Sequence, residues 1–432
     1  MKIPDNNFLT DDLIYKNALN FVASVEDGLQ EIIRSRTNGV LARLQKVLKA
    51  FSDEGLGVHH FQSLNGYGHG DLGRELIDNV FAKVFVCEKA AVRMQFVSGT
   101  HAISSALFGV LRPGDNLLSV TGKPYETLEE VIGLRGKGQG SLLEFDIKYD
   151  QISIFNNGII DLNSLKKALK IPRKMAFIQR SCGYSWRPSL SIKNISDICM
   201  LIHDIQPDCI CFVDNCYGEF VEEMEPTQAG ADLIAGSLIK NPGGTIVPTG
   251  GYIAGKSKFV DMACCRLTAP GIGTQAGSGF NLNRLVLQGL FLSPQMVAES
   301  LIGSEIIAGV FHALGFKVNP LPGQFRGDLI QAICLEKVET LKIVCRCFQS
   351  SSPVNSYLRP VPAEMPGYES DLIMAGGTFI DGSTSEFSAD APLITPFNLF
   401  VQGGTHRAHI KIAITNSLVA LAKEEIVKLP VI

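Results

Sequence analysis

The chain has 432 residues, of which 46% are apolar and 19% are charged, a composition that supports a packed core and excludes an intrinsically disordered protein. Its 39 basic and 43 acidic residues give a formal net charge of −4, which offers no electrostatic reason to expect nucleic acid or an anionic membrane as a partner. No apolar run approaches the roughly 18 residues that span a bilayer. Residues 1–12 are polar and lack the apolar segment of a secretory signal, so we expect a soluble, cytoplasmic protein.

The predicted elements begin with helices and continue as an alternation of strands and helices. Apolar residues spaced three and four apart predict helix over residues 11–51, a glycine-rich connection follows, and residues 74–83 return to helix. The remaining predicted elements are strands at 92–97, 116–120, 141–147, 175–179, 209–213, 232–236 and 252–254, with helices at 102–110 and 126–133. Short strands separated by helices predict a mostly parallel α/β sheet that is covered on both faces.

The pattern changes after about residue 300. A helix-like stretch at 297–314 leads into a proline-rich region with short strands, which is typical of a smaller α+β domain. We therefore expect an N-terminal helical segment with a glycine-rich arm (1–65), a large α/β domain (66–300) and a small C-terminal α+β domain (301–432).

The 11 cysteines do not form a recognisable metal-binding or disulfide pattern. Cys209, Cys211 and Cys216 flank one strand-like run, but no C-x-x-C pair typical of a zinc site is present. We expect most of the cysteines to be buried, reduced side chains, and we predict no metal site.

A small-residue turn, Ser98-Gly99-Thr100-His101, lies between a predicted strand and a predicted helix. Backbone N–H groups at a helix N-terminus favour an anion, and the hydroxyls of Ser98 and Thr100 could add donors. An ordinary strand-to-helix turn explains the same residues equally well.

Two further chemical groups follow predicted strands. Asp214 ends the apolar run 210–213, and ligands of open α/β sheets lie beyond the carboxyl ends of strands, although Asp214 could instead only cap a turn. Lys240 follows another strand in the run Ser237-Leu238-Ile239-Lys240-Asn241-Pro242-Gly243-Gly244. Partial burial would make its amine available as a nucleophile, whereas a solvated loop lysine is the ordinary alternative.

Residues Gly250–Ser257 match the P-loop pattern letter for letter. A P-loop needs a preceding strand and a loop whose backbone surrounds phosphates, but here residues 252–254 are themselves strand-like and Pro248 occupies the preceding stretch. We interpret the match as coincidence and keep a nucleotide-binding protein as the alternative from a different class. His406 and His409 share a helix spacing, but no neighbouring ligand completes a metal site, so we expect a surface or packing role.

Taken in order, these segments resemble the pyridoxal-phosphate enzymes of the cystathionine and methionine gamma-lyase group, and in particular the methionine gamma-lyase-like family often called aluminium resistance proteins. The resemblance covers most of the chain from about residue 60. It rests on the motifs described above together with Gly66-Tyr67-Gly68, Gly122-Lys123-Pro124-Tyr125-Glu126-Thr127-Leu128-Glu129-Glu130, Gln179-Arg180-Ser181, Val213-Asp214-Asn215, Pro366-Gly367-Tyr368 and Gly376-Gly377-Thr378-Phe379.

The resemblance implies the fold and the cofactor. The fold would be the aspartate-aminotransferase type (fold type I), with a three-layer α/β/α large domain that binds pyridoxal 5'-phosphate and a smaller α+β domain. Lys240 would form the internal Schiff base with the cofactor, and Asp214 would pair with its pyridine nitrogen. The residues that would hold the phosphate are Ser98, Gly99, Thr100 and Ser237.

Two tyrosines complete the implied site. Tyr125 would stack on the cofactor ring and could protonate a leaving group. Tyr67 would reach the phosphate of the neighbouring subunit, which implies a homodimer or homotetramer with shared active sites.

The implied reaction is β- or γ-elimination from a sulfur-containing amino acid. Cystathionine lyases bind the substrate carboxylate with an arginine in a late strand, but residues 398–404 contain none, so Arg180 is a candidate replacement and a purely structural arginine is the alternative. Cys182, beside it, could shape the pocket or simply pack. The same scaffold would also support transamination, or a non-catalytic protein that keeps the cofactor for stability or partner binding.

Overall fold

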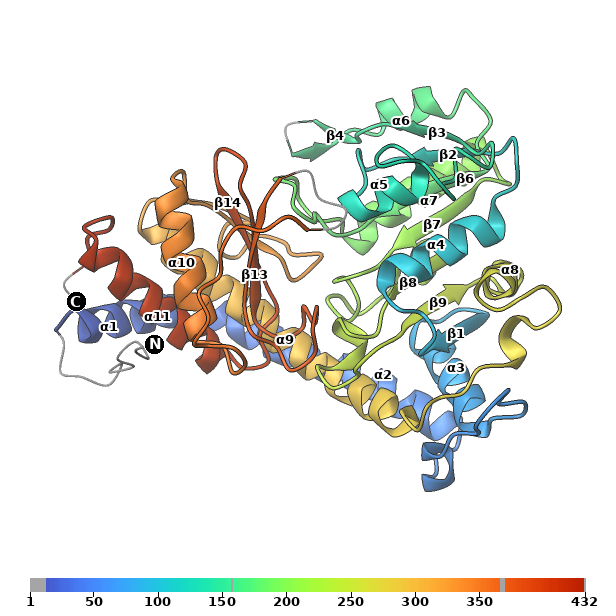
Figure 1. Cartoon of the computed structure of the whole chain (residues 1–432), viewed down its shortest axis with the longest axis horizontal. Helices are drawn as coiled ribbons and strands as arrows, with labels where there is room; N and C mark the ends of the chain where they lie inside the picture. The colour runs from blue at the N-terminus through green and yellow to red at the C-terminus, as the bar shows by residue number, and fades with distance from the viewer. Residues whose placement is uncertain (1–12, 157, 366–369, 431–432) are drawn as a thin grey trace. The chain divides into compact units, whose positions relative to one another are not determined.

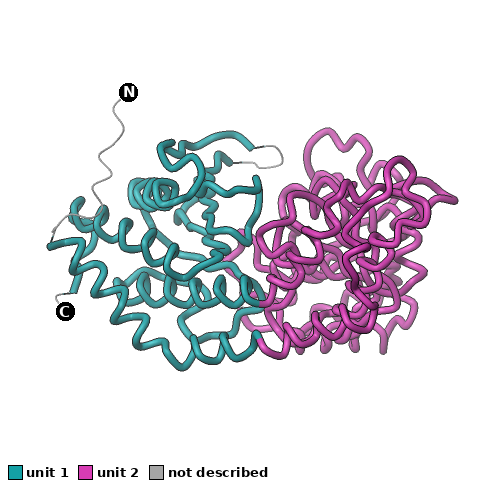
Figure 2. Tube along the Cα trace, turned by 90° about the horizontal axis from the view of Figure 1, so that it is seen from below, with its two compact units in different colours: residues 1–40, 295–432 teal, residues 41–294 magenta. Residues whose placement is uncertain are grey.

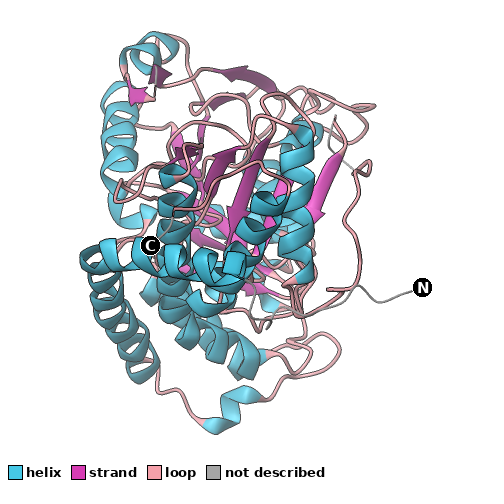
Figure 3. Cartoon of the chain, turned by 90° about the vertical axis from the view of Figure 1, so that its left-hand side faces the viewer, coloured by secondary structure: helices cyan, strands magenta, loops and turns pink. Residues whose placement is uncertain are grey.

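The computed structural model describes residues 13–156, 158–365 and 370–430, so the motif Pro366-Gly367-Tyr368 lies outside the described residues. The chain forms two compact units, of which unit 1 contains residues 1–40 and 295–432 and unit 2 contains residues 41–294 (Figure 2). The helix α1 (Leu13–Gly28) and the chain up to residue 40 thus belong with the C-terminal part of the chain, and the second division lies at 294/295. Both units contain helices and strands, which Figure 3 distinguishes by colour.

Unit 2 is built on a seven-stranded sheet with the order β1-β9-β8-β7-β6-β2-β3 (Figure 1). Strands β2, β3, β6, β7 and β8 pair in parallel, whereas β9 is antiparallel to both of its neighbours, β1 and β8. The strands are β1 (Lys89–Arg93), β2 (Asn116–Ser119), β3 (Lys148–Gln151), β6 (Met175–Gln179), β7 (Ile210–Asp214), β8 (Leu233–Ser237) and β9 (Gly251–Gly255). This arrangement confirms the predicted mostly parallel α/β sheet.

Helices cover both faces of this sheet. Successive side chains of each strand point to opposite faces, and because the strands are buried on both, each face packs against other elements. Ile253 of β9 belongs to the core beneath α4 (Gly99–Val110), α5 (Glu126–Ile132) and α8 (Ser257–Leu267). The adjacent Tyr252 packs on the other side, where Phe85 lies 4.9 Å from it between ring centroids, at the end of α3 (Leu72–Val84). The other elements of unit 2 are α7 (Ile192–Ile205), α6 (Asn163–Ala168), η1 (Val58–Phe61), η2 (Pro226–Ala229), η3 (Asn241–Gly243), η4 (Gly273–Gln275) and the hairpin β4 (Phe155–Asn156) and β5 (Ile159–Ile160).

The predicted strand at 141–147 is wrong. The segment turns back on itself, since Ile147 N–H donates to the carbonyl of Leu142 and Leu142 N–H donates to Val131 at the end of α5. Leu142 and Ile147 are buried in the same core as α5 instead of pairing in the sheet, whereas Leu143 and Phe145 are exposed, and the edge strand β3 begins at Lys148. A short apolar run satisfies either arrangement, so periodicity alone could not distinguish them.

Unit 1 contains a five-stranded antiparallel sheet with the order β10-β11-β14-β13-β12. The strands are β10 (Lys317–Asn319), β11 (Gln331–Cys334), β12 (Leu372–Ala375), β13 (Ser388–Pro392) and β14 (Asn398–Gln402). One apolar core joins the sheet to α10 (Val338–Ser350), α11 (Arg407–Lys423) and the N-terminal α1 (Leu13–Gly28). This antiparallel sheet with helices agrees with the predicted α+β class.

Two long helices contribute residues to both units, α2 (Gln30–Asp53) and α9 (Asn283–Ala313), and the division within α9 lies at Pro294. By length and composition α9 could cross a membrane, which its sequence pattern did not suggest. However, 67% of its most apolar 18-residue window is buried inside the protein, as in a core helix.

Candidate active site

The carboxyl ends of two neighbouring parallel strands bring the predicted groups together. Asp214 is the last residue of β7 and Ser237 the last of β8, and these strands pair in parallel. Because parallel strands end at the same edge of a sheet, the segments that follow them share one region. Lys240 lies there, immediately before η3.

Lys240 is surrounded by groups that favour its charged form. Its Nζ lies 4.0 Å from the ring centroid of Tyr217, a residue that the chain holds at a φ of 69°. Such left-handed backbone is strained for a tyrosine and is typical of functional sites. Burial alone would lower the pKa of Lys240, but the neighbouring Cys216, Tyr217, Asp214 and Tyr125 outweigh it, so the pKa is raised.

Asp214 is a buried carboxylate whose surroundings suit a cationic partner. Burial raises its pKa above the ordinary value, although the charge of Lys240 and hydrogen bonds from Cys216 oppose this effect. The Cys216 N–H donates to Asp214 Oδ1 at 3.1 Å. Burial removes the water that would otherwise stabilise the negative charge of Asp214. A protonated ring nitrogen placed against this carboxylate would provide the compensating positive charge.

The predicted anion turn forms the start of α4. Ser98 caps the helix, since its Oγ accepts a hydrogen bond from His101 N–H at 3.1 Å. Gly99 allows a close approach, because a Cβ there would lie 3.2 Å from Ser237 Cβ and 3.3 Å from Cys216 Sγ. The first N–H groups of this 12-residue helix thus lie beside the end of β8, an arrangement that fits a phosphate.

Tyr125 contacts this turn and lies close enough to Asp214 to be affected by its charge. Its hydroxyl donates to Thr100 Oγ1 at 3.0 Å, and its backbone N–H donates to Gln179 Oε1 at 3.1 Å. Burial, followed by the charge of Asp214, raises the pKa of Tyr125 well above its ordinary value. The phenol is therefore neutral and can donate a proton. The donor set of lysine, carboxylate, phenol and helix N-terminus fits pyridoxal phosphate.

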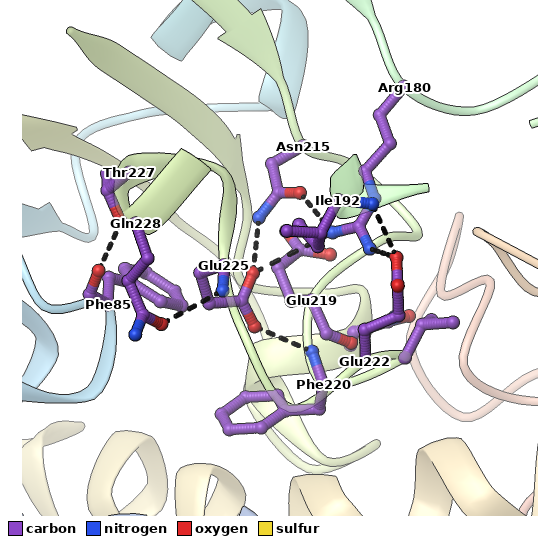
Figure 4. A network of polar contacts seen from close by, with 12 residues as sticks. Phe85, Arg180, Ile192, Asn215, Glu219, Phe220, Glu222, Glu225, Thr227 and Gln228 are labelled. Carbon is purple, nitrogen blue, oxygen red and sulfur yellow. Dashed lines mark hydrogen bonds and ion pairs between the residues drawn. The ribbon is translucent and has the colours of Figure 1, made fainter. Parts of the chain in front are cut away.

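Arg180 lies in a buried polar network (Figure 4). Its side chain is fully buried, and its guanidinium donates to Asn215 Oδ1 at 2.9 Å and to Glu222 Oε1 at 3.0 Å. Glu225 adds an ion pair at 3.8 Å. These contacts favour the structural alternative for Arg180 over a substrate-binding role.

A model of the methionine gamma-lyase family matches residues 18–422. The chain belongs to the methionine gamma-lyase family. It is 45% identical over 383 residues to the uncharacterised protein YnbB of Bacillus subtilis, a match that covers 88% of this chain and 91% of that protein.

Solved structures show the same relationship. A candidate cystathionine beta-lyase involved in aluminium resistance from Clostridium acetobutylicum is 41% identical, with a TM-score of 0.91 over 94% of this chain and 96% of that one. A carbon–sulfur lyase involved in aluminium resistance from Clostridium novyi NT is 42% identical, with a TM-score of 0.89 over 95% and 96% of the two chains. The expected family, fold type and class of pyridoxal-phosphate-dependent lyase are confirmed, and the aminotransferase alternative is not favoured.

The P-loop alternative is not favoured either. Gly251–Gly255 forms β9, an antiparallel strand between β1 and β8, rather than a phosphate-binding loop. Lys256, the lysine of the matched pattern, pairs with Asp232 at 2.6 Å. This segment therefore lacks the loop that a P-loop protein needs around the phosphates.

Several predicted side chains lie apart from the lysine cluster or serve other roles. Tyr67 is 78% exposed and stacks on His69, with ring centroids 5.6 Å apart. His406 caps α11 by accepting a hydrogen bond from Ala408 N–H, and His409 contacts the carbonyl of Ser351 at 2.7 Å. His406 is thus an exposed capping residue and His409 a packing residue, within the expected surface or packing roles, although His406 precedes the helix instead of sharing a face of it.

Sequence reasoning missed Gln179, Cys216 and Tyr217 as site residues. Cys216 and Tyr217 follow Asp214 by two and three positions, so their place after a strand end was a usable signal.

Among the cysteines, Cys87, Cys265 and Cys347 are partly exposed and the other eight are buried, as predicted.

A buried carboxyl group behind the site predicts a pH-dependent stability. Glu219 Oε1 accepts a hydrogen bond from the Tyr252 hydroxyl at 2.7 Å, and Oε2 has no hydrogen-bond partner among the described residues. Burial raises its pKa from 4.5 to about 8. Between pH 4.5 and about pH 8 the folded protein therefore keeps the Glu219 proton, whereas the unfolded chain has lost it. The contribution of Glu219 to the free energy of unfolding is complete below pH 4.5 and is lost as the pH rises through about 8.

Glu219→Gln keeps an acceptor for Tyr252 and stays neutral, so it should remove this loss. Urea unfolding should show the variant gaining about 1–4 kcal/mol over the wild type between about pH 5 and about pH 9. Glu223→Gln, at a neighbouring exposed glutamate, should show no such change. An identical pH dependence for Glu219→Gln and the wild type would contradict the assignment.

Proposed function

We propose that this protein eliminates a thiol from the β- or γ-carbon of a sulfur-containing amino acid, with pyridoxal phosphate linked covalently to Lys240. The observation that carries the proposal is the meeting of Lys240 with the buried Asp214 at the ends of adjacent parallel strands, beside the N-terminus of α4. Family membership supports the same chemistry.

Pyridoxal phosphate, when bound, supplies an electron sink for the electrons released at the substrate Cα. The residues of this chain would bind and orient it. Asp214 would hold a proton on the ring nitrogen, and the first N–H groups of α4, with Thr100 and Ser237, would bind the phosphate. Gly99 keeps the space between these two elements open.

Two side chains would move protons. Lys240 Nζ would remove the proton from the substrate Cα, and the cation-favouring cluster around it stabilises the ammonium that results. The neutral Tyr125 hydroxyl would protonate the leaving sulfur, with Thr100 fixing its direction at 3.0 Å.

The test of the proposal measures cofactor attachment and products separately. Borohydride treatment of the purified protein should fix the phosphopyridoxyl group on the peptide that contains Lys240, as read by mass spectrometry. Incubation with sulfur-containing amino acids should then release thiol, ammonia and keto acid in equal amounts. Conversion of the cofactor to its amine form without ammonia would instead indicate transamination, and attachment at another lysine would overturn the assignment.

We also propose a cytoplasmic homodimer or homotetramer in which Tyr67 serves the partner's site. The exposure of Tyr67, at 78%, supports this, as does the anchoring of its segment by Gly277 N–H, which donates to the Tyr67 carbonyl at 3.0 Å. The backbone is therefore held while the side chain remains available to a second copy.

Mixing two inactive variants tests the shared site. If Tyr67 acts across subunits, mixed dimers of Tyr67→Ala and Lys240→Ala contain one site with both residues intact, so activity should recover to about one quarter of the wild-type value. If mixed dimers form, as shown by copurification of differently tagged chains, but no activity returns, then Tyr67 acts within its own chain or not at all.

A further inference from the structure

A second polar site lies in unit 2 at the edge of the sheet opposite Lys240. Asp232 comes directly before β8, whereas Lys240 follows the other end of that strand. Beside Asp232 is an open cavity of about 960 Å³, lined in part by Cys87, His203 and Lys256. The elimination chemistry proposed above uses none of these residues.

Three side chains of the kinds that can bind a metal lie close together here, of which His203 and Asp232 line the cavity and Cys211 is buried beside Asp232. His203 Nε2, Cys211 Sγ and a carboxylate oxygen of Asp232 all lie within 4.8 Å of one another. They come from α7, β7 and the turn before β8, so no short sequence motif could reveal them. Asp232 and Cys211 are buried, and His203 is partly exposed.

Contacts around the cluster already orient its ligand atoms. Asp232 Oδ2 lies 3.1 Å from His203 Nε2 and accepts a hydrogen bond from Cys211 N–H at 2.7 Å, whereas Lys256 occupies the other oxygen, Oδ1, at 2.6 Å. Such outer contacts are the kind that fix metal ligands in position.

We propose that His203, Cys211 and Asp232 bind one zinc ion, with a water molecule from the cavity as the fourth ligand. Imidazole nitrogen, thiolate sulfur and carboxylate oxygen are the three donor types that zinc takes in proteins, and sulfur disfavours magnesium and calcium. Tetrahedral zinc bonds of about 2.0–2.3 Å place ligand atoms about 3.3–3.7 Å apart. His203 Nε2 and Asp232 Oδ2, at 3.1 Å, are already close to that spacing, so only a wider pair within the 4.8 Å limit has to close on binding.

Binding balances in charge and protons. The Cys211 thiol releases its proton to solvent, and the resulting thiolate and the Asp232 carboxylate together neutralise the two positive charges of the ion. Lys256 can remain on Oδ1 while zinc takes Oδ2. The ion would link α7, β7 and the turn before β8, at a site separate from the lysine site.

The experiment titrates metal-stripped protein with zinc alone. We expect one equivalent per chain and a rise in the thermal midpoint of unfolding. Cobalt in its place should give the intense d–d bands of a tetrahedral site, at longer wavelengths than pyridoxal phosphate absorbs. Magnesium should do neither, and a magnesium response equal to that of zinc would contradict a thiolate ligand.

Variants locate the ion. His203→Gln and Cys211→Ser should each weaken zinc binding by at least roughly tenfold, the lower limit seen even when an outer contact of a metal site is lost. His203 is partly exposed, so its replacement should leave the fold intact, which circular dichroism checks. Cys87→Ser, which changes a thiol that lines the cavity outside the proposed ligand set, is the matched control and should bind zinc as the wild type does.

Removing Lys256 gives a further control. Lys256→Met takes a competing cation away from Asp232 and should keep zinc binding at least as tight as in the wild type. Zinc binding that is unchanged by both His203→Gln and Cys211→Ser, or no binding at one equivalent, would overturn the proposal. Neither result would bear on the attachment of pyridoxal phosphate to Lys240.

Discussion

Lys240→Arg should lower kcat for elimination by at least about 10³-fold, within the range that a lost proton-transfer group accounts for. Arginine keeps the positive charge that Cys216, Tyr217, Asp214 and Tyr125 surround, so the folded site should persist. A guanidinium stays protonated, however, and can neither link covalently to the cofactor nor take the Cα proton. Steady-state kinetics and borohydride labelling measure the two losses independently.

The control for this variant is a lysine on the surface of the same unit. Lys193 is 81% exposed and pairs only with Asp197 four residues on, among the described contacts. Lys193→Arg should therefore leave both kcat and labelling unchanged. If Lys240→Arg retained more than about a tenth of wild-type activity, proton transfer by this residue would be excluded, because a loss of less than about tenfold is smaller than the contribution of a general acid–base group to the rate.

The sequence predicted the positions of Asp214 and Lys240 relative to the strands because two local rules combine there. An apolar run that ends in Asp214 and another that leads to Lys240 both indicate parallel strands, and parallel strands place their carboxyl ends together. Neighbouring β7 and β8 confirm that arrangement. The anion turn was predictable for the same reason, since small residues between a strand and a helix mark the N-terminus of α4.

What the sequence could not predict depends on contacts between distant segments. Helix α1 belongs to unit 1 because it packs with α11, where Lys411 pairs with Glu26 across 385 positions of sequence. The apolar spacing within α1 predicts a helix but does not indicate which distant helix it packs against. The antiparallel direction of β9 could not be predicted either, because the residue pattern of a strand does not indicate whether it pairs in parallel or antiparallel.

Arg180 shows the same limit at the level of one side chain. Its place after β6 allowed two interpretations, a substrate-binding arginine beside the cofactor and a structural arginine, because the direction of a long side chain depends on which partners surround it. Here Asn215, Glu222 and Glu225 provide acceptors on the buried side, and a Cβ at Gly218 would collide with the side chain at 2.5 Å. The lack of a side chain at position 218 is as much a part of this arrangement as the acids are.

Asp214→Asn should lower kcat by about 10²–10³-fold while leaving the protein folded, because asparagine keeps the shape of the side chain but removes its charge. The amide can still accept the hydrogen bond from Cys216 N–H that holds this side chain at 3.1 Å. It cannot keep a proton on the cofactor nitrogen, so the electron sink weakens and removal of the Cα proton should become slower.

Exchange of the substrate Cα proton with deuterated solvent, followed by NMR, separates this effect from a general structural one. Exchange should slow in parallel with kcat, whereas KM and cofactor content should change little. The matched control is Asp208→Asn, an exposed aspartate in the turn before the same strand, β7. If Asp214→Asn exchanged the proton at the wild-type rate, then its carboxylate would not be the group that supports carbanion formation, and another residue would have to be sought at the end of β7.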